Sequence, residues 1–273
     1  MSVAIDNAKG NYRFLPGIAP FSSGAVAMPG WQVVHATLRR PMPWRKGFEL
    51  IDAHLAEQKR PRAALCAIEL RIPAALTPDG FDGFNAGYQA LLEEWDLLVG
   101  GQNPIARTNV APIVGAPREA SLYGFAYTTP EDRLTATGTH LTATGRQGSR
   151  QGSTDPTTPT FVVAGSGETR RDGRGVPALV RGGESSPEAM REKAAYVLGV
   201  MRDRLHGLGG DWADVTAINV YTAHPIEPFL ADTILRGVGP AAIHGVTWHL
   251  SRPPVIDIEF EMDMRGVAKR LWL

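Results

Sequence analysis

Hydrophobic and polar positions in the second part of the chain predict a strand followed by a helix, and then the same pair again. Ser186 is a candidate N-cap before Pro187, which suits the first helical position. Apolar residues then recur at helical spacing up to Leu205, where a glycine-rich stretch ends the run. The predicted elements are strands at 160–164, 215–221, 243–250 and 255–264, a helix from 186 to about 207, and a shorter helix between 225 and 235.

The first part of the chain repeats this order, strand–helix–strand–helix–strand–strand. A repeat of this length indicates a duplicated α+β unit rather than a solenoid, which needs several short repeats. Helices on one face of each sheet would leave the other face to a neighbour, so an oligomer is expected. The predicted elements are strands at 32–38, 63–72, 107–114 and 121–127, and helices at 44–58 and 82–98.

The stretch between the two parts lacks aromatic residues and is rich in Gly, Ser and Thr. Such a composition is typical of a flexible linker. We therefore predict a first domain over residues 1–130, a linker over 131–159 and a second domain over 160–273.

Charge and cysteine content exclude several classes of protein. Lys+Arg and Asp+Glu both number 28, so no excess of one sign indicates binding to nucleic acid or to an acidic membrane. The single Cys66 provides neither an internal disulfide nor a metal framework. The first residues do not resemble a signal peptide and no apolar run is long enough to span a bilayer, so a cytoplasmic protein is expected.

Several short segments resemble the RidA/YjgF (reactive intermediate deaminase) family. They are Ile18–Ser22, Phe84–Tyr88 and Ile105–Thr108 in the first part, and Gly165–Glu168, Ala213–Tyr221 and Ile258–Glu261 in the second. The resemblance implies an α+β fold of two tandem RidA-like (chorismate-mutase-like) domains, each a mixed, mostly antiparallel sheet with two helices on one face. It also implies a homotrimer, with sites between neighbouring units.

Each half departs from the family pattern where the other keeps it. The second half has His244 where the family arginine is expected, and the first half has Tyr123 where the family glutamate is expected. We therefore hypothesise a composite pocket. One half would supply the substrate-binding residues Arg107, Asn85, Phe21 and Ser22, and the other the substrate-binding Gly167 and the catalytic Ser166 and Glu259. Tyr123 and His244, at the two departing positions, are further candidate substrate-binding residues.

These residue types fit the hydrolysis of an enamine or imine. The planar guanidinium of Arg107 can hold a substrate carboxylate through two parallel hydrogen bonds. A partly buried Glu259 can activate water and later donate a proton, while Ser22 and Ser166 orient that water. The plain alternative is an ion-paired arginine on a strand, with glutamates alternating as on any half-exposed strand.

No metal or organic cofactor is expected. His244 and His249 fall on one predicted strand at an odd spacing, so they would point to opposite faces and not share a metal ion. The leading hypothesis is a cofactor-free deaminase acting on a small amino-carboxylate, such as a 2-aminoacrylate- or aminomuconate-like intermediate. Two alternatives stay open: a non-catalytic protein that binds small carboxylates, and a chorismatase-like or ring-opening enzyme.

Overall fold

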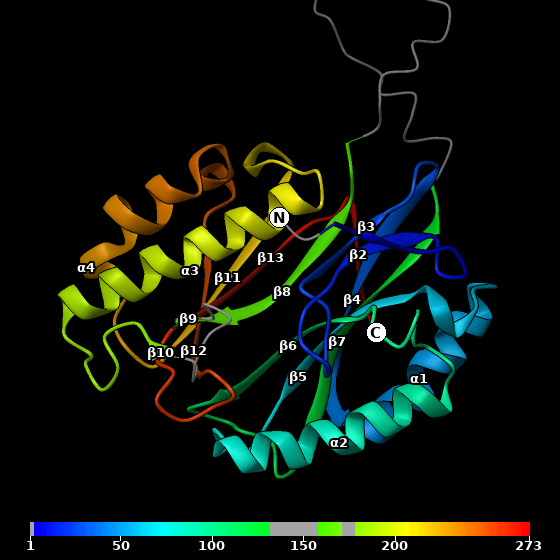
Figure 1. The fold of residues 1–273 in the computed structure, drawn as a ribbon, viewed down its shortest axis with the longest axis horizontal. Coiled ribbons are helices and arrows are strands. Elements are labelled where there is room, and N and C mark those ends of the chain that lie inside the picture. The colour runs from blue at the N-terminus through cyan, green and yellow to red at the C-terminus, as the bar shows by residue number, and fades with distance from the viewer. Residues whose placement is uncertain (1–2, 132–157, 171–177) are drawn as a thin grey trace, which may run out of the picture.

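Twelve strands form one mixed sheet within residues 3–131, 158–170 and 178–273, the part of the chain that the computed structural model describes (Figure 1). Nearly all of the linker predicted at 131–159 lies outside these residues. The strand order is β1 (Ile5–Asn7), β2 (Tyr12–Leu15), β3 (Gly24–Ala27), β8 (Phe161–Gly167), β13 (Glu261–Gly266), β11 (Ala217–Thr222), β12 (Thr247–Arg252), β6 (Ala106–Pro112), β5 (Leu65–Arg71), β7 (Ser121–Pro130), β4 (Trp31–Pro43) and β14 (Lys269–Trp272). Strands β9 (Thr169–Arg170) and β10 (Ala178–Leu179) form a separate pair.

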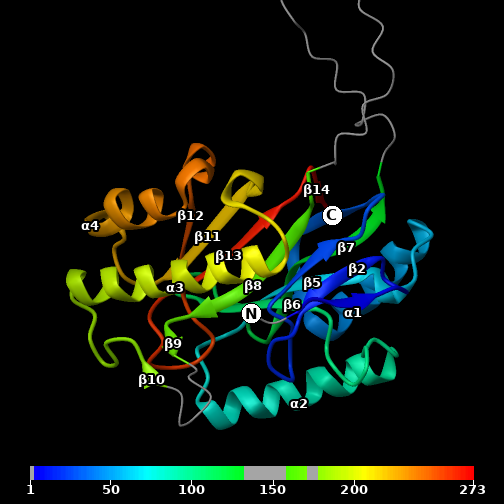
Figure 2. The same cartoon turned by 45° about the horizontal axis from the view of Figure 1, so that its top comes forward.

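Helices cover the strands from two opposite sides, as the two views in Figures 1 and 2 show. On one side lie α1 (Trp44–Glu57) and α2 (Pro78–Glu94), and on the other α3 (Pro187–Gly207) and α4 (Glu227–Phe229). A π-helical turn (Leu230–Leu235) and a 3₁₀ helix (Gly239–His244) continue from α4, and shorter 3₁₀ turns lie at Arg62–Ala64 and Trp212–Asp214. The strands of the two halves therefore face each other in the middle of the molecule.

Capping residues begin the two long helices that border the site. Thr77 accepts a hydrogen bond from the Gly80 amide before α2, and Ser186 accepts one from the Ala189 amide before α3. Proline occupies the first turn of both helices, where its missing N–H costs nothing. Beneath each helix lies a separate apolar core.

Each half contributes a strand that pairs directly with a strand of the other half. Strand β3 pairs antiparallel with β8, and β14, near the end of the chain, pairs in parallel with β4. A third junction is narrow: β12 meets β6 only at two residue pairs, Ser251 with Pro112 and Arg252 with Ala111. The two halves are thus joined by backbone hydrogen bonds as well as by packing.

Charged side chains are buried where the two halves face each other. Glu69 Oε1 on β5 accepts one hydrogen bond from Arg265 Nη1 on β13 and lies 2.6 Å from His35 Nε2. Burial alone would raise the pKa of Glu69, but the charges of Arg265, His35 and Arg71 outweigh it and hold that pKa well below the ordinary value. Because a buried charge is costly without a partner, this cluster favours one alignment of the two halves.

The α+β class predicted from the sequence is confirmed, and its helices lie close to the predicted ranges. Two closing strands are shorter than predicted. Residues 239–244 form a 3₁₀ helix, so β12 begins only at Thr247, and residues 255–260 form a loop before β13. His244 and His249 therefore lie on different elements, and the argument from a shared strand was wrong. Strands β1 to β3 and β14 were not predicted.

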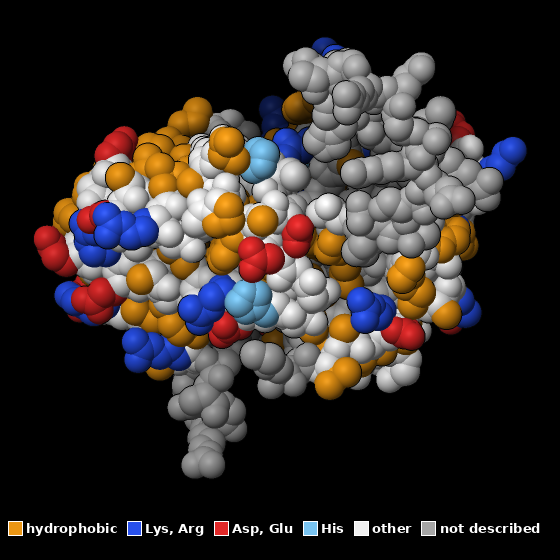
Figure 3. Space-filling model, turned by 90° about the horizontal axis from the view of Figure 1, so that it is seen from above, with side chains coloured by type: hydrophobic (Ala, Val, Ile, Leu, Met, Phe, Trp, Pro, Cys, Tyr) orange, Lys and Arg blue, Asp and Glu red, His pale blue; other side chains and the backbone are white. Residues whose placement is uncertain are grey.

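Basic and acidic side chains are intermixed on the molecular face in Figure 3. Within the part of the chain that is described, no helix has both the length and the apolar character needed to cross a membrane.

Candidate active site

A cavity of about 300 Å³ lies between the two halves. This volume lies at the lower end of the range for small-molecule sites. Its walls are formed by the segment before β3, α2, β6, β8, α3 and the loop before β13. The lining residues are Pro16, Gly17, Ile18, Phe21, Ser23, Phe81, Arg107, Asn109, Gly165, Ser166, Gly167, Thr169, Tyr196, Val200, Arg204, Pro254, Val255, Ile258 and Glu261.

Arg107 is a buried cation on the β6 wall, with 3% of its surface exposed. Its Nη2 donates to Asn85 Oδ1 on α2 at 2.6 Å, whereas its buried Nη1 has no hydrogen-bond partner. Among the described residues no carboxylate forms an ion pair with it, and burial lowers its pKa to about 10. An unpaired nitrogen on a buried cation at a cavity wall suits an anionic ligand.

Aromatic rings surround this guanidinium and fix its position. Their centroids lie 4.8 to 5.7 Å from Cζ, within the range of cation–π attraction. The rings belong to Phe21, Phe81, Phe84 and Tyr88.

Asn109 stands two residues further along β6, on the same face of the strand as Arg107. It is 3% exposed, and neither its Nδ2 nor its Oδ1 has a hydrogen-bond partner among the described residues. Leaving a buried amide unsatisfied is costly, so a ligand with both a donor and an acceptor would fit here.

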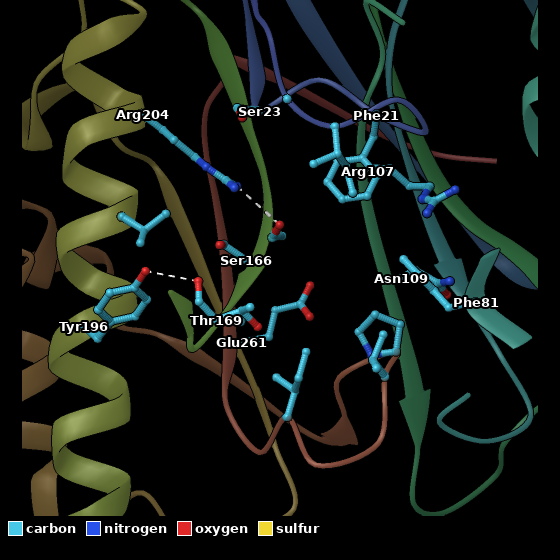
Figure 4. A pocket seen from close by; sticks show the side chains of 18 of the residues that line it. Phe21, Ser23, Phe81, Arg107, Asn109, Ser166, Thr169, Tyr196, Arg204 and Glu261 are labelled. Carbon is cyan, nitrogen blue, oxygen red and sulfur yellow. Dashed lines mark hydrogen bonds between the residues drawn. The ribbon is translucent and has the colours of Figure 1, made fainter. Parts of the chain in front are cut away.

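Glu261 faces the same cavity from β13, between Arg107 and Arg204 as Figure 4 shows. Burial raises its pKa to about 8, Asp263 adds to the rise, and the charge of Arg204 opposes it. At neutral pH this carboxyl group is therefore mostly protonated. A Cβ at Gly165 would collide with Glu261 Oε1, so the glycine makes room for the carboxyl group.

Glu259, the predicted catalytic residue, lies outside the cavity lining. Its carboxylate contacts His224 Nε2 at 2.8 Å and Arg252 Nη1 at 3.1 Å. The sequence predicts a strand over 255–264, but the strand begins at Glu261 and has an irregularity between Met262 and Met264. The loop before it turns the Glu259 side chain toward His224.

The other predicted site residues divide into two groups. The cavity is lined by Phe21, Ser166 and Gly167. Asn85 is not among the lining residues, but it accepts a hydrogen bond from Arg107, which is. Gly167 allows the close approach of Ile258, with which a Cβ would clash.

The remaining predicted residues lie elsewhere. The Ser22 hydroxyl is buried and donates to the Pro104 carbonyl at 3.0 Å, and Ser23 lines the cavity in its place. The Tyr123 ring lies 3.9 Å from the guanidinium of Arg71, while His244 is exposed at the end of a 3₁₀ helix.

Helix α3 supplies three cavity residues that sequence reasoning missed. Tyr196, Val200 and Arg204 are four residues apart and so share one face of the helix. Arg204 Nη1 donates to the carbonyls of Ala164 at 2.9 Å and Gly165 at 3.3 Å. The spacing of four was readable in the sequence, but nothing in the sequence shows that this face lines the same cavity as β6.

The described residues contain no group of three or more His, Cys, Asp or Glu side chains placed to hold a metal ion. The cavity offers a fixed guanidinium, an amide without partners, a carboxyl group of raised pKa and a second arginine. This combination can bind an anion and transfer protons beside it.

A family model and a curated relative that match this chain both carry the name of a deaminase. Residues 4–271 match the family described as 2-aminomuconate deaminase CnbZ. A 2-amino-5-chloromuconate deaminase from Comamonas testosteroni is 34% identical over an alignment of 276 positions, which covers 98% of each chain. Among solved structures, a putative endoribonuclease from Thermotoga maritima MSB8 is 18% identical, with a TM-score of 0.27, over 40% of this chain and 80% of its own. A chorismatase is 16% identical, with a TM-score of 0.45, over 96% of this chain and 78% of its own.

Proposed function

Since the chain belongs to the 2-aminomuconate deaminase family, we propose that it is an enzyme that hydrolyses the C–N bond of an aminomuconate-like amino-carboxylate. The observation that supports this most directly is Arg107, which lines the cavity together with Glu261 and has a buried Nη1 without a hydrogen-bond partner. The substrate carboxylate would accept hydrogen bonds from Arg107, and the carbon bearing the amino group would then lie near Glu261.

Proton transfer through Glu261 accounts for every step of the hydrolysis, with water as the co-reactant. The protonated carboxyl group first donates to the enamine carbon, which converts the enamine to an iminium ion. The resulting carboxylate takes a proton from water as the water oxygen bonds to the iminium carbon. Glu261 next protonates the amino nitrogen, ammonia leaves, and the carboxylate recovers a proton from the new hydroxyl group as the carbonyl forms.

Asn109 is suited to hold the nitrogen and the attacking oxygen during these steps. Its Oδ1 can accept from the substrate N–H, and its Nδ2 can donate to the oxygen that adds to the carbon. A bound intermediate would thereby satisfy the two amide atoms that lack partners in the protein. This proposal is cofactor-free, because side chains and water carry every step.

We also infer that the chain arose from two RidA-like units. The common order of elements in both halves supports this, as does a cavity whose walls come from both halves of one chain. The homotrimer implied by the resemblance stays a prediction.

The direct test is ammonia release from 2-aminomuconate by the purified protein, with loss of the dienamine absorbance recorded in parallel. We expect turnover by the wild type and a fall of about a hundredfold or more in kcat/KM for Arg107→Ala, because the anchoring charge is lost. Arg202→Ala is the matched control, since Arg202 is exposed on α3. Ligand-dependent thermal stabilisation without any turnover would instead indicate a binding protein.

A further inference from the structure

The cavity has a second cationic end. Figure 4 shows Arg204 extending from α3 on one side, and Arg107 on β6 on the other. Arg204 is partly buried, and its two backbone hydrogen bonds to β8 hold the guanidinium at the cavity wall. Its charge reaches the cavity interior, since it acts on Glu261 more strongly than the charge of Arg107 does.

The surface beside Arg204 is apolar. Val200 lies one turn before Arg204 on the same face of α3, and Val255 and Ile258 line the cavity from the loop before β13. A ligand that spans the cavity would therefore contact a cation at each end and aliphatic side chains on one side of its middle. An unsaturated chain with a carboxylate at each end has this distribution of charge.

We propose that Arg204 binds the second carboxylate of the substrate, so that the cavity selects dicarboxylates over monocarboxylates of the same length. This inference rests on the proposed function for the identity of the reacting end, which Arg107 holds. It assigns Arg204 to specificity and not to proton transfer. Loss of its charge should therefore raise KM for 2-aminomuconate and change kcat little.

A pair of unreactive ligands tests the assignment without turnover. Muconate carries two carboxylates on a diene, and sorbate is the same chain with a methyl group in place of the second carboxylate. By isothermal titration, we expect the wild type to bind muconate about tenfold or more tighter than sorbate. In Arg204→Met the affinity for muconate should fall to near that for sorbate, while the affinity for sorbate should not change.

Two further variants make the result specific. Arg204→Lys keeps the charge and should retain part of the preference for muconate. If Arg204→Met does not fold, Arg204→Lys serves as the test. Its affinity should fall for muconate but not for sorbate. Arg202→Met removes an exposed arginine from the same helix and should leave the preference unchanged.

The outcomes separate this inference from the proposed function. A preference for muconate that survives in Arg204→Met overturns the role of Arg204, and so does an equal loss of affinity for both ligands. A wild type that binds the two ligands equally also overturns it, even if 2-aminomuconate is turned over. Failure of the wild type to deaminate 2-aminomuconate overturns the proposed function, whatever the muconate titration shows.

Discussion

Glu168 and Lys193 form an ion pair with no solvent exposure of either side chain, and Lys193 Nζ lies 3.0 Å from Glu168 Oε1. The same carboxylate accepts the backbone amides of Glu259 at 2.7 Å and Phe260 at 3.0 Å. Three donors thus compensate one buried charge. Through these contacts α3 and the residue directly after β8 fix the end of the loop that places Ile258 on the cavity wall.

Lys193→Met should destabilise the protein strongly. It leaves the Glu168 charge buried without its cation, which costs about 3–5 kcal/mol in comparable cases. Urea unfolding measures the loss. The double variant Lys193→Met/Glu168→Gln should recover part of it, because no buried charge is then left. A loss below about 1 kcal/mol in the single variant would show that water reaches the carboxylate.

Glu261→Gln should abolish most of the activity, because an amide cannot donate and recover protons as the carboxyl group does. The expected fall in kcat is about a hundredfold to ten-thousandfold. In the wild type, a step that needs the protonated form should slow as pH rises through about 8, the raised pKa of Glu261. Steady-state rates across this range measure the profile.

Glu259→Gln is the matched control for that variant, since this glutamate pairs with His224 outside the cavity. Its activity should stay within about threefold of the wild type. Inactivity of Glu259→Gln together with an active Glu261→Gln would restore the catalytic role predicted from the sequence.

The raised pKa of Glu261 also predicts how stability depends on pH. The folded state binds this proton more tightly than the unfolded chain, whose pKa is near 4.5. The contribution of this proton to the free energy of unfolding is therefore fully present below about pH 4.5 and is lost as pH rises through about 8. Relative to the wild type, Glu261→Gln should melt higher at about pH 9 and show no such gain at about pH 4. An equal difference at both pH values would contradict the assignment.

Asn85 should act as a positioning residue for Arg107. Asn85→Ala removes the acceptor 2.6 Å from Nη2, and we expect KM to rise about tenfold with a smaller change in kcat. Asn85→Asp should impair substrate binding more than Asn85→Ala, because its carboxylate would neutralise the cation that the substrate needs. Binding of muconate to Asn85→Asp at wild-type affinity would contradict an anchoring role for Arg107.

Glu69→Gln should destabilise the junction between the halves by about 3–5 kcal/mol, because Arg265 would stay buried without its counter-charge. Since the pKa of Glu69 is lowered in the folded protein, its contribution is present above the unfolded pKa and is lost as pH falls through the folded one. The difference between variant and wild type should therefore shrink at low pH. Acid titration of both proteins by circular dichroism checks this.

Local patterns predicted the helices and the site residue Arg107, but not which glutamate of the last segment faces the cavity. Caps at Thr77 and Ser186 and the periodicity behind them lie in the sequence itself, so α2 and α3 were found close to their ranges. Arg107 was found because its own segment carries the resemblance. In contrast, Glu261 was overlooked in favour of Glu259, because the loop before β13 breaks the alternation that the strand prediction assumed.

Contacts between distant parts of the chain had no local signal. Arg204 shares a cavity with β6 only because of how the halves pack, and β14 pairs with β4, which lies more than 200 residues earlier in the chain. Asn109, in contrast, could have been predicted from the sequence. It lies two positions after Arg107 on the same strand, so both side chains point to the same face.

Strand β3 of the first half pairs with β8 of the second, and β14 of the second half pairs with β4 of the first. The two halves are therefore not independent modules. A fragment that ends near residue 130 would expose the edge of β4 that β14 now covers, and the complementary fragment would expose the edge of β8 that β3 covers. Such open edges promote aggregation. We expect each fragment to be insoluble when it is expressed by itself. On co-expression each fragment would cover the open strand edge of the other, so the two should form a soluble complex.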